Sequence, residues 1–303
     1  MQKNNQKSKP LVSKAVIPAA GLGTRLLPMT KEIPKEMLPI GTYENGTIFL
    51  KPMLQLIFER LYDDGIRQFC VITGRGKRSI EDHFNPDWSL AESVKHAASG
   101  KSLADFFERL EKSRIFFVNQ SSRKGFGDAV MHAEDFVGND SFFVHAGDDF
   151  IISGGNESSA LTYPVRLEKI LAEYKADAVL LAERSKDPRH FGVIVGKEIS
   201  PGLHSIDRVL EKPKTPPSNL TVVAVYLFKP VIFDMLRSIE PDENGELQLT
   251  SAIELMIEKG LKVLAVELRP DQKRVEIGTP NSYLNSLLSS IELDQKTGVG
   301  SPS

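Results

Sequence analysis

The chain has 303 residues, of which 41% are hydrophobic and 26% are charged. This length is enough for one large α/β domain or two smaller ones, each with a sizeable core. The 38 Lys and Arg residues are balanced by 40 Asp and Glu residues, so the net charge of -2 excludes the global basic field of a nucleic-acid-binding protein. The single cysteine, Cys70, excludes an intramolecular disulfide framework and a multi-cysteine zinc site.

The two ends of the chain differ in composition from the rest. The first ten residues, MQKNNQKSKP, are polar and lack the apolar run of a secretory signal. No segment approaches ~20 consecutive apolar residues, so we expect no membrane span and a cytoplasmic protein. We expect residues 1–12 to form a flexible leader, residues 13–293 a single domain, and the Gly/Ser/Pro-rich residues 294–303 a flexible tail.

From residue 14 onward, short apolar runs alternate with stretches of helical periodicity, which is typical of a sheet covered by helices. In the first half, the predicted strands are 15–17, 69–72, 115–118, 142–145 and 178–181, and the predicted helices are 53–63, 78–84, 103–112, 128–136 and 163–174. The second half has predicted strands at 191–195, 205–210 and 221–228 and predicted helices at 231–239, 249–258 and 281–293. We therefore expect an α/β fold with a Rossmann-like mixed sheet, mostly parallel, and a strand-rich second lobe.

The glycine-rich segment AAGLGTRLLP directly follows the first predicted strand. Small residues and glycines let backbone N–H groups approach a phosphate closely, and the planar fork of Arg25 suits phosphate oxygens. The segment lacks the Gly-Lys-Ser/Thr ending of a Walker A motif and the third glycine of the dinucleotide fingerprint. By itself it fits an ordinary tight turn as well as a phosphate site. As a phosphate site it would use Ala19, Ala20, Gly21, Gly23, Thr24 and Arg25.

The next segment, TKEIPKEMLP, adds positive charge in a restricted geometry. It contains Lys31 and Lys35, and the prolines at positions 28, 34 and 39 limit this stretch to extended or turn conformations. Arg25, Lys31 and Lys35 therefore fall within one strand-to-helix connection, where α/β sheets bind ligands beyond the carboxyl ends of their strands. The combination favours an anionic ligand over a simple solvated face.

The whole run KAVIPAAGLGTRLLPMTKEIPKEMLPI resembles the signature of the sugar-nucleotide nucleotidyltransferases. Its TKEIPKEMLP part is similar to the UTP–glucose-1-phosphate uridylyltransferase branch in particular. The similarity extends through VITGRGKRSIEDHF, GFGDAV, AGDD, FGVI, LEKP and ENGELQLTSAI, and thus covers nearly all of the chain between about residues 14 and 283. The resemblance implies a glycosyltransferase-A-like fold with a nucleotide-binding half at about 13–150 and a sugar-phosphate-binding half at about 151–293.

An acidic pair follows the strand predicted at 142–145. Asp148 and Asp149 come after Ala-Gly, and their carboxylate oxygens suit Mg²⁺, although an acidic pair after glycine also caps turns. The resemblance assigns the metal to Asp148 and leaves Asp149 as a neighbour. It also implies a second metal carboxylate at Glu276, in RVEIG, where the family commonly has Asp. Mg²⁺ is therefore the expected cofactor.

The sugar side is predicted in the second half of the chain. As a bare pattern, Glu211 and Lys212 before a proline would be a surface ion pair at a turn. The resemblance implies that Lys212 contacts the phosphate of the sugar phosphate and that Glu211 accepts hydrogen bonds from sugar hydroxyls. It also implies sugar contacts at Gly192 and at the backbone of Val223. The Ala-Val that follows Val223 stands where the family often has Gly-Arg, so this pocket is not a copy of the family's pocket.

The nucleotide side is completed by three further residues. The resemblance places the nucleobase against Gln120 and Gly125, because an amide can pair with a pyrimidine edge, and it adds Glu36 to the nucleotide site. Without the resemblance, Gln120 would be an ordinary loop amide. The histidines that have no nucleophilic partner and no metal-binding spacing, and that we interpret as structural, are His83, His132 and His145.

The implied reaction joins UTP and glucose 1-phosphate into UDP-glucose and pyrophosphate by in-line attack on the α-phosphorus. The attacking phosphate oxygen is already an anion, so the reaction requires no general base. The obstacle is repulsion between two anions, which costs roughly 4 kcal/mol per pair of unit charges at ~4 Å. Cations must offset this repulsion. We expect the groups that do so to lie around one cleft: Arg25, Lys35, Lys212, and Mg²⁺ on Asp148 and Glu276.

Several alternatives stay open at this point. The chain could transfer a uridylyl or thymidylyl group to another sugar 1-phosphate, because Gln120 alone does not fix the base. It could also be a catalytically inactive regulatory paralogue, which the presence of the basic and acidic site residues disfavours. Residues 41–51 lengthen the usual connection and would reshape a pocket rim or an oligomer contact. The resemblance implies a homodimer or homotetramer, with residues 283–293 as a candidate contact.

Overall fold

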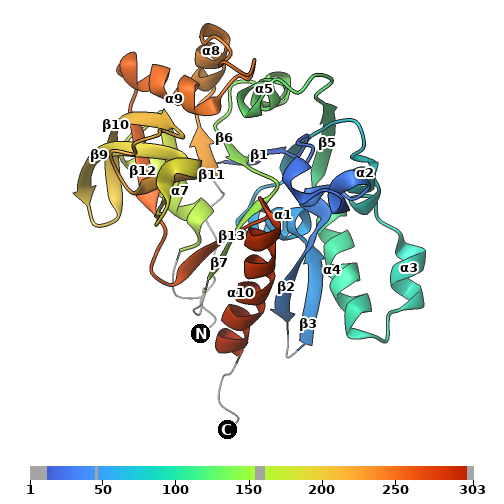
Figure 1. Ribbon diagram of the computed structural model, residues 1–303. Coiled ribbons are helices and arrows are strands. Elements are labelled where there is room, and N and C mark those ends of the chain that lie inside the picture. The colour runs from blue at the N-terminus through green and yellow to red at the C-terminus, as the bar shows by residue number, and fades with distance from the viewer. Residues whose placement is uncertain (1–11, 45–46, 154–160, 299–303) are drawn as a thin grey trace, which may run out of the picture.

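A nine-stranded sheet runs through the centre of the molecule (Figure 1). The computed structural model describes residues 12–44, 47–153 and 161–298, so the predicted leader lies outside the described residues except for Val12, which is buried. In spatial order the strands are β5 (Arg114–Asn119), β4 (Gln68–Thr73), β1 (Lys14–Pro18), β6 (Phe142–His145), β11 (Leu220–Phe228), β8 (Ala178–Arg184), β12 (Val263–Glu267), β10 (Leu203–Glu211) and β9 (Gly192–Ser200).

The sheet is mixed, as the sequence predicted. Strands β5, β4, β1 and β6 are parallel neighbours, and β8 and β12 form a further parallel pair. Strand β11 runs antiparallel to both β6 and β8, and β10 runs antiparallel to both β12 and β9. Because the first four strands are parallel, the loops that follow them all leave the sheet at one edge.

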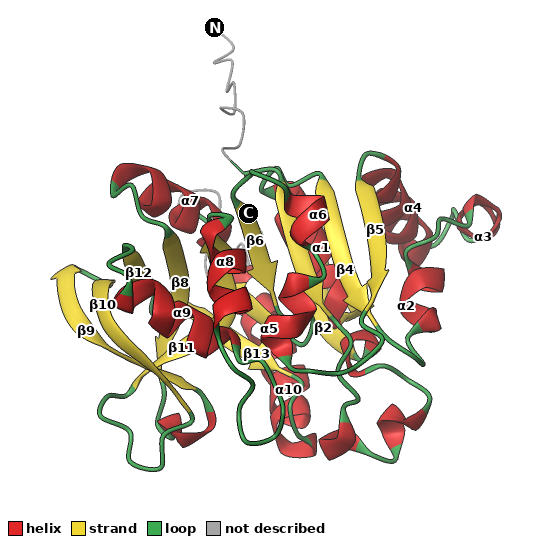
Figure 2. Cartoon of the chain, turned by 90° about the horizontal axis from the view of Figure 1, so that it is seen from above, coloured by secondary structure: helices red, strands yellow, loops and turns green. Residues whose placement is uncertain are grey.

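Helices cover both faces of the sheet (Figure 2). One hydrophobic layer contains residues of α1 (Met53–Asp63), α4 (Ala98–Glu111) and α7 (Tyr163–Glu173). The opposite layer contains residues of α5 (Phe126–Met131), α6 (Glu134–Val137), α8 (Val231–Ser238) and α9 (Leu249–Glu258). Successive side chains of a strand point to opposite faces of the sheet, so each strand contributes to both hydrophobic layers. In β1, Ala15 and Ile17 face the first layer and Val16 faces the second. Two short helices, α2 (Arg78–His83) and α3 (Trp88–Ser93), follow β4.

Two antiparallel ribbons lie outside the central sheet. One pairs β2 (Pro39–Glu44) with β3 (Thr47–Pro52), and the other pairs β7 (Asp149–Ser153) with β13 (Gln272–Glu276). Helix α10 (Pro280–Gly298) packs on β2 and β13 (Figure 1). Helix α10 approaches β2 closely at Gly41, where a Cβ atom would lie 2.4 Å from Cγ1 of Ile291. Along the described part of the chain, none of the helices has both the length and the apolar character that a bilayer crossing requires.

Most of the predicted elements are present, with several differences, one of which is the unpredicted short helix α3. The single helix predicted at 128–136 is two short helices, α5 and α6, separated at residues 132–133. Helix α10 continues to Gly298, so the chain is still helical where the sequence predicted the start of the tail, and residues 299–303 lie outside the described residues. Strand β12 and both ribbons were not predicted. Within residues 41–51, whose length the sequence analysis noted, residues 41–44 and 47–51 are paired strands of the ribbon β2–β3.

Candidate active site

The segments after three of the parallel strands, β1, β5 and β6, line a cavity of about 420 Å³, the first cavity. The glycine-rich segment follows β1, Gln120 follows β5, and Asp148 follows β6. Predicted nucleotide-site residues that line this cavity are Ala20, Gly21, Gly23, Thr24, Lys35, Glu36, Gln120, Gly125 and Asp148. The structure therefore brings together, at one edge of the sheet, residues that are up to 128 positions apart in the chain (Ala20 to Asp148).

Local contacts fix the shape of the glycine-rich segment. Gly23 has φ 66, a left-handed conformation that glycine adopts at no cost, and it precedes a 3-10 turn at Thr24–Leu26. The Thr30 hydroxyl donates a hydrogen bond of 2.7 Å to the Gly23 carbonyl, and a Cβ atom at Gly23 would lie 3.1 Å from the Thr30 methyl. Leu26 is buried and anchors the turn, whereas Arg25 is exposed and lines neither of the two cavities described here.

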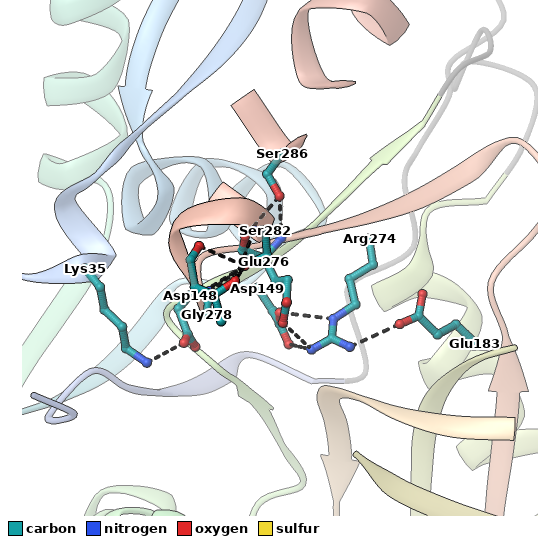
Figure 3. A network of polar contacts seen from close by, with 10 residues as sticks. Lys35, Asp148, Asp149, Glu183, Arg274, Glu276, Gly278, Ser282 and Ser286 are labelled. Atoms are coloured by element: carbon teal, nitrogen blue, oxygen red, sulfur yellow. Dashed lines mark hydrogen bonds and ion pairs between the residues drawn. The ribbon is translucent and has the colours of Figure 1, made fainter. Parts of the chain in front are cut away.

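An ion pair joins Lys35 to Asp148 at the wall of the first cavity (Figure 3). Burial alone would lower the pKa of the Lys35 ammonium, but the carboxylates of Asp148 and Glu36 outweigh burial and raise this pKa. Burial alone would raise the pKa of Asp148, but Lys35 and, further away, Arg274 lower it. Both groups are therefore held in their charged forms.

A second ion pair lies deeper, between Glu36 and Lys77. The Lys77 ammonium is 2.6 Å from Oε2 of Glu36, and the two side chains are only 6% and 2% exposed. Burial raises the pKa of Glu36 and lowers the pKa of Lys77, because neither charge is hydrated. Glu36 also lines the first cavity, so Lys77 neutralises a buried carboxylate in the wall of this cavity.

The loop that carries Gln120 and Gly125 is held by the second half of the chain. Gly125 has φ 100, and a Cβ atom there would lie 2.6 Å from the Leu247 carbonyl oxygen, so a side chain would collide with backbone. The Leu247 N–H donates to the Lys124 carbonyl at 2.6 Å, and the Gly127 N–H donates to the Leu247 carbonyl at 2.9 Å. This backbone clamp explains why glycine stands at position 125.

The ribbon β7–β13 brings the predicted metal carboxylates to one place. Glu276 pairs with Asp149 in the ribbon, and the Ile277 N–H donates to the Asp148 carbonyl at 2.9 Å. Within the described residues, no group of three or more His, Cys, Asp or Glu side chains is arranged as a metal site. Two carboxylates nevertheless fit Mg²⁺, which is usually held by one or two carboxylates together with substrate phosphates and water. Asp148 and Glu276 therefore suit a divalent cation that binds with its substrate.

Arg274 connects the acidic residues of this region (Figure 3). Its guanidinium donates two hydrogen bonds to Asp149, at 3.0 and 2.8 Å, and a third to Glu183 at 3.1 Å, and it lies 3.5 Å from Glu276. Its cationic face also covers the Phe191 ring at 4.8 Å. Burial raises the pKa of Asp149 to about 6, even though Arg274 opposes this rise. Asp149 is thus a buried partner of Arg274 and not a cavity residue.

A smaller second cavity of about 190 Å³ contains most of the predicted sugar-side residues, including Gly192, Glu211 and Lys212. Thr250 donates a hydrogen bond of 2.7 Å to Oε2 of Glu211, and the Lys212 ammonium lies 2.7 Å from Oε1 of the same carboxylate. Lys212 has φ 40, which is uncommon outside glycine, and its N–H donates to the Phe191 carbonyl at 3.2 Å. This strained position directs the end of β10 toward the cavity.

The sequence predicts one cleft around Arg25, Lys212 and Asp148, and the structure has two adjoining cavities at this place. Asp148 lines the first cavity, Lys212 lines the second, and Arg25 lines neither. The two cavities adjoin, because Phe126 lines both. Three further predicted residues line neither cavity: Ala19, Val223 and Glu276. Ala19 and Val223 are buried in the core, and the contact predicted for Val223 is through its backbone.

Sequence reasoning missed four residues of this region: Arg274, Lys77, Thr250 and Arg123. Arg123 lines the first cavity, and its Nε donates to the Ala20 carbonyl at 3.3 Å. The sequence did contain an indication of the role of Arg274. Arg274 and the predicted site residue Glu276 are two positions apart, and in a strand such residues share a face. No comparable signal exists for Lys77, whose partner is 41 positions away in the chain.

Comparison with known proteins gives a consistent result. Residues 14–290 match the family model described as Nucleotidyl transferase. A Streptococcus pyogenes serotype M1 protein named UTP–glucose-1-phosphate uridylyltransferase 2 is 36% identical over 281 residues, covering 91% of this chain and 89% of that protein. A solved UDP-glucose pyrophosphorylase complexed with UDP-glucose is 30% identical with a TM-score of 0.79, covering 93% of this chain and 99% of its own.

A second solved structure, a UTP-bound UGPase from Acinetobacter baumannii, is 27% identical with a TM-score of 0.76 and covers 94% of this chain and 98% of its own. The similarity thus spans both cavities and both ribbons instead of one local motif. The chain belongs to the nucleotidyl transferase family, in which its relatives include proteins named UTP–glucose-1-phosphate uridylyltransferase.

Proposed function

We propose that this chain transfers a uridylyl group from UTP to α-D-glucose 1-phosphate, giving UDP-glucose and pyrophosphate. The observation that carries the proposal is the pair of adjoining cavities that share Phe126. The first has a glycine-rich wall suited to a nucleotide phosphate, and the second has the Glu211–Lys212 pair suited to a sugar phosphate. The names of the relatives and of the solved structures support the same reaction.

The proposed chemistry depends on charge and position, not on proton removal. Each close pair of unit charges between the two anionic substrates costs roughly 4 kcal/mol at an effective dielectric of about 20. In the proposal, Lys35 supplies positive charge at the first cavity and Lys212 supplies it at the second. The Lys212 side chain is 58% exposed, so it can turn from Glu211 to an incoming phosphate. Arg25 would reach the leaving pyrophosphate from the rim, because its neighbour Thr24 lines the first cavity.

Nucleotidyl transferases generally use a divalent metal, and we propose Mg²⁺ for this chain. Asp148 and Glu276 would hold it: Asp148 lines the first cavity, and Glu276 pairs with Asp149, the residue that follows Asp148, in the ribbon β7–β13. When bound, Mg²⁺ would neutralise charge on the phosphate oxygens. Lys35 already balances Asp148, so we propose that this lysine turns to a substrate phosphate when the carboxylate takes up the metal.

The test is pyrophosphate release by the purified full chain with Mg²⁺. The panel combines UTP, dTTP, CTP and ATP with glucose 1-phosphate, galactose 1-phosphate and N-acetylglucosamine 1-phosphate. We expect the largest kcat/KM for UTP with glucose 1-phosphate. A larger value for dTTP or for another sugar phosphate would replace the proposed substrates, and no release with any pair would support an inactive regulatory paralogue.

We further propose that the protein acts as a homodimer or homotetramer in the cytoplasm. Helix α10 presents Leu284 and Leu288, which are 56% and 62% exposed, and the neighbouring ribbon presents Ile48 and Leu50. These four apolar side chains suit contact with a second copy. Light scattering on the purified chain tests the assembly, and a Leu288→Glu variant should shift it toward the monomer. Cell fractionation tests the location.

A further inference from the structure

Both hydrogens of the Gln120 side-chain amide are used inside the protein. Nε2 donates to the Gly125 carbonyl at 3.2 Å and to Oδ2 of Asp128 at 2.6 Å. Gln120 lines the first cavity and is 4% exposed. Among the residues that the structure describes, none donates a hydrogen bond to its Oε1. Oε1 is therefore the one polar atom with which this side chain can bind a ligand in the cavity.

The chemistry of the two partners fixes which way the amide points. Reversing the amide would set Oε1 against the Gly125 carbonyl and the Asp128 carboxylate, and neither of these groups carries a hydrogen to donate. The bond to Asp128 is the shorter of the two and is assisted by the carboxylate charge, so it is the stronger constraint. Gln120 thus offers the cavity an acceptor and no donor.

The position of Asp128 is itself fixed by the backbone. It lies in the first turn of α5, which begins after Gly125, and its side chain is 17% exposed. The preceding residue, Gly127, is hydrogen-bonded through its N–H to Leu247. His132, one turn later, lies 3.6 Å from the same carboxylate oxygen. Asp128 therefore faces Gln120 from a helix turn that cannot shift without breaking the clamp to Leu247.

We propose that Asp128 is a positioning residue that selects the nucleobase by locking Gln120 with its acceptor toward the first cavity. This inference rests on the proposed function and deepens it. Uracil carries a hydrogen on N3, between two carbonyl groups, and this N–H can donate to Oε1. Cytosine has a lone pair on N3 instead, which an acceptor repels. The lock therefore favours a base with an imide N–H over cytosine.

The experiment compares kcat/KM for UTP and for CTP with glucose 1-phosphate in the full chain. Asp128→Asn keeps the size of the side chain and removes the charge that assists the hydrogen bond from Nε2, so the lock on Gln120 weakens. Asp128→Ala removes the partner and suits a helix, so it decides the question if the Asn variant fails to fold. We expect the UTP/CTP ratio to fall about tenfold or more, through KM, while kcat with UTP stays within about threefold.

Three controls separate positioning from a structural effect. Asp135→Asn removes the same charge from the first turn of α6, at an exposed residue that lines neither cavity, and should leave the ratio unchanged. Asp128→Glu keeps a carboxylate and should retain more of the ratio than Asp128→Asn. In a Gln120→Ala background, Asp128→Asn should change the ratio no further, because its effect passes through Gln120.

An unchanged UTP/CTP ratio in an active Asp128→Ala variant, which has no acceptor at this position, would overturn the inference alone. An equal fall in both Gln120 backgrounds would also overturn it, since Asp128 would then act by another route. Wild-type protein that releases no pyrophosphate from UTP would overturn the proposed function and this inference with it.

Discussion

Replacing Arg274 by Met should produce a large loss of stability. Asp149 is 4% exposed, and Arg274 supplies two of its hydrogen bonds, at 2.8 and 3.0 Å. Removing one partner of a buried pair leaves an uncompensated charge and costs about 3–5 kcal/mol. Because the Arg274 side chain is itself only 9% exposed, water cannot replace it readily. We therefore expect the free energy of unfolding to fall by about 4 kcal/mol.

Urea unfolding, followed by far-UV circular dichroism, measures this loss. Arg78→Met is the matched control, because Arg78 is 88% exposed and lies 3.6 Å from Asp82, an exposed pair that contributes no more than about 1 kcal/mol. Asp149→Asn in the Arg274→Met background should restore part of the loss, since it removes the stranded charge. A loss below about 1 kcal/mol for Arg274→Met, or no coupling between the two positions, would refute the reasoning.

Three further predictions concern the proposed catalytic groups and acid stability. Lys212→Ala should lower kcat about a thousandfold with little change in UTP binding. The control Lys214→Ala, at an exposed residue outside both cavities, should have little effect on kcat. Steady-state kinetics and UTP titration of both variants measure these effects. Asp148→Asn should abolish metal-dependent turnover, and activity that still responds to Mg²⁺ titration would contradict the assignment. Burial lowers the pKa of His145 to about 4, whereas the same histidine in the unfolded chain has a pKa of about 6.5. Below pH 6.5 the unfolded chain therefore binds a proton that the folded chain does not bind. The free energy of unfolding should fall by up to about 3 kcal/mol between pH 6.5 and pH 4. Urea unfolding across this range checks the slope, and His145→Gln should reduce it without removing it, because burial also lowers the pKa of His83 to about 4.

All strands of the central sheet except β12 could be predicted, because they appear in the sequence as short apolar runs between stretches of helical periodicity. Strand β6 and helices α1 and α9 have the predicted bounds, since each combines a clear apolar period with a distinct end. The ribbon β2–β3 carried a local signal that was not used, the Asn-Gly pair at 45–46 between two β-rich runs. The ribbon β7–β13 had no such signal, because its two strands are far apart in the chain.

The candidate site also has residues that could be predicted from the sequence and residues that could not. Motif resemblance located Lys35, Gln120 and Asp148, and the structure places all three on one cavity. Sequence could not show that Arg25 and Lys212 lie away from that cavity, because the distance between loops depends on how the strands are ordered. Nor could it show what Asp128 does, since its role follows from the direction of one amide group.

The pairing of β7 with β13 has a consequence for how the protein is made. The two strands are separated by well over 100 positions, and Arg274 and Glu276 are synthesised long after Asp148 and Asp149. In a nascent chain that ends before β13, Asp149 lacks its ion-pair partner, the Arg274 guanidinium. The same chain has only Asp148 of the two proposed metal carboxylates. Such a chain should therefore gain activity only near the end of translation, which stalled-ribosome complexes of graded length can test by pyrophosphate release.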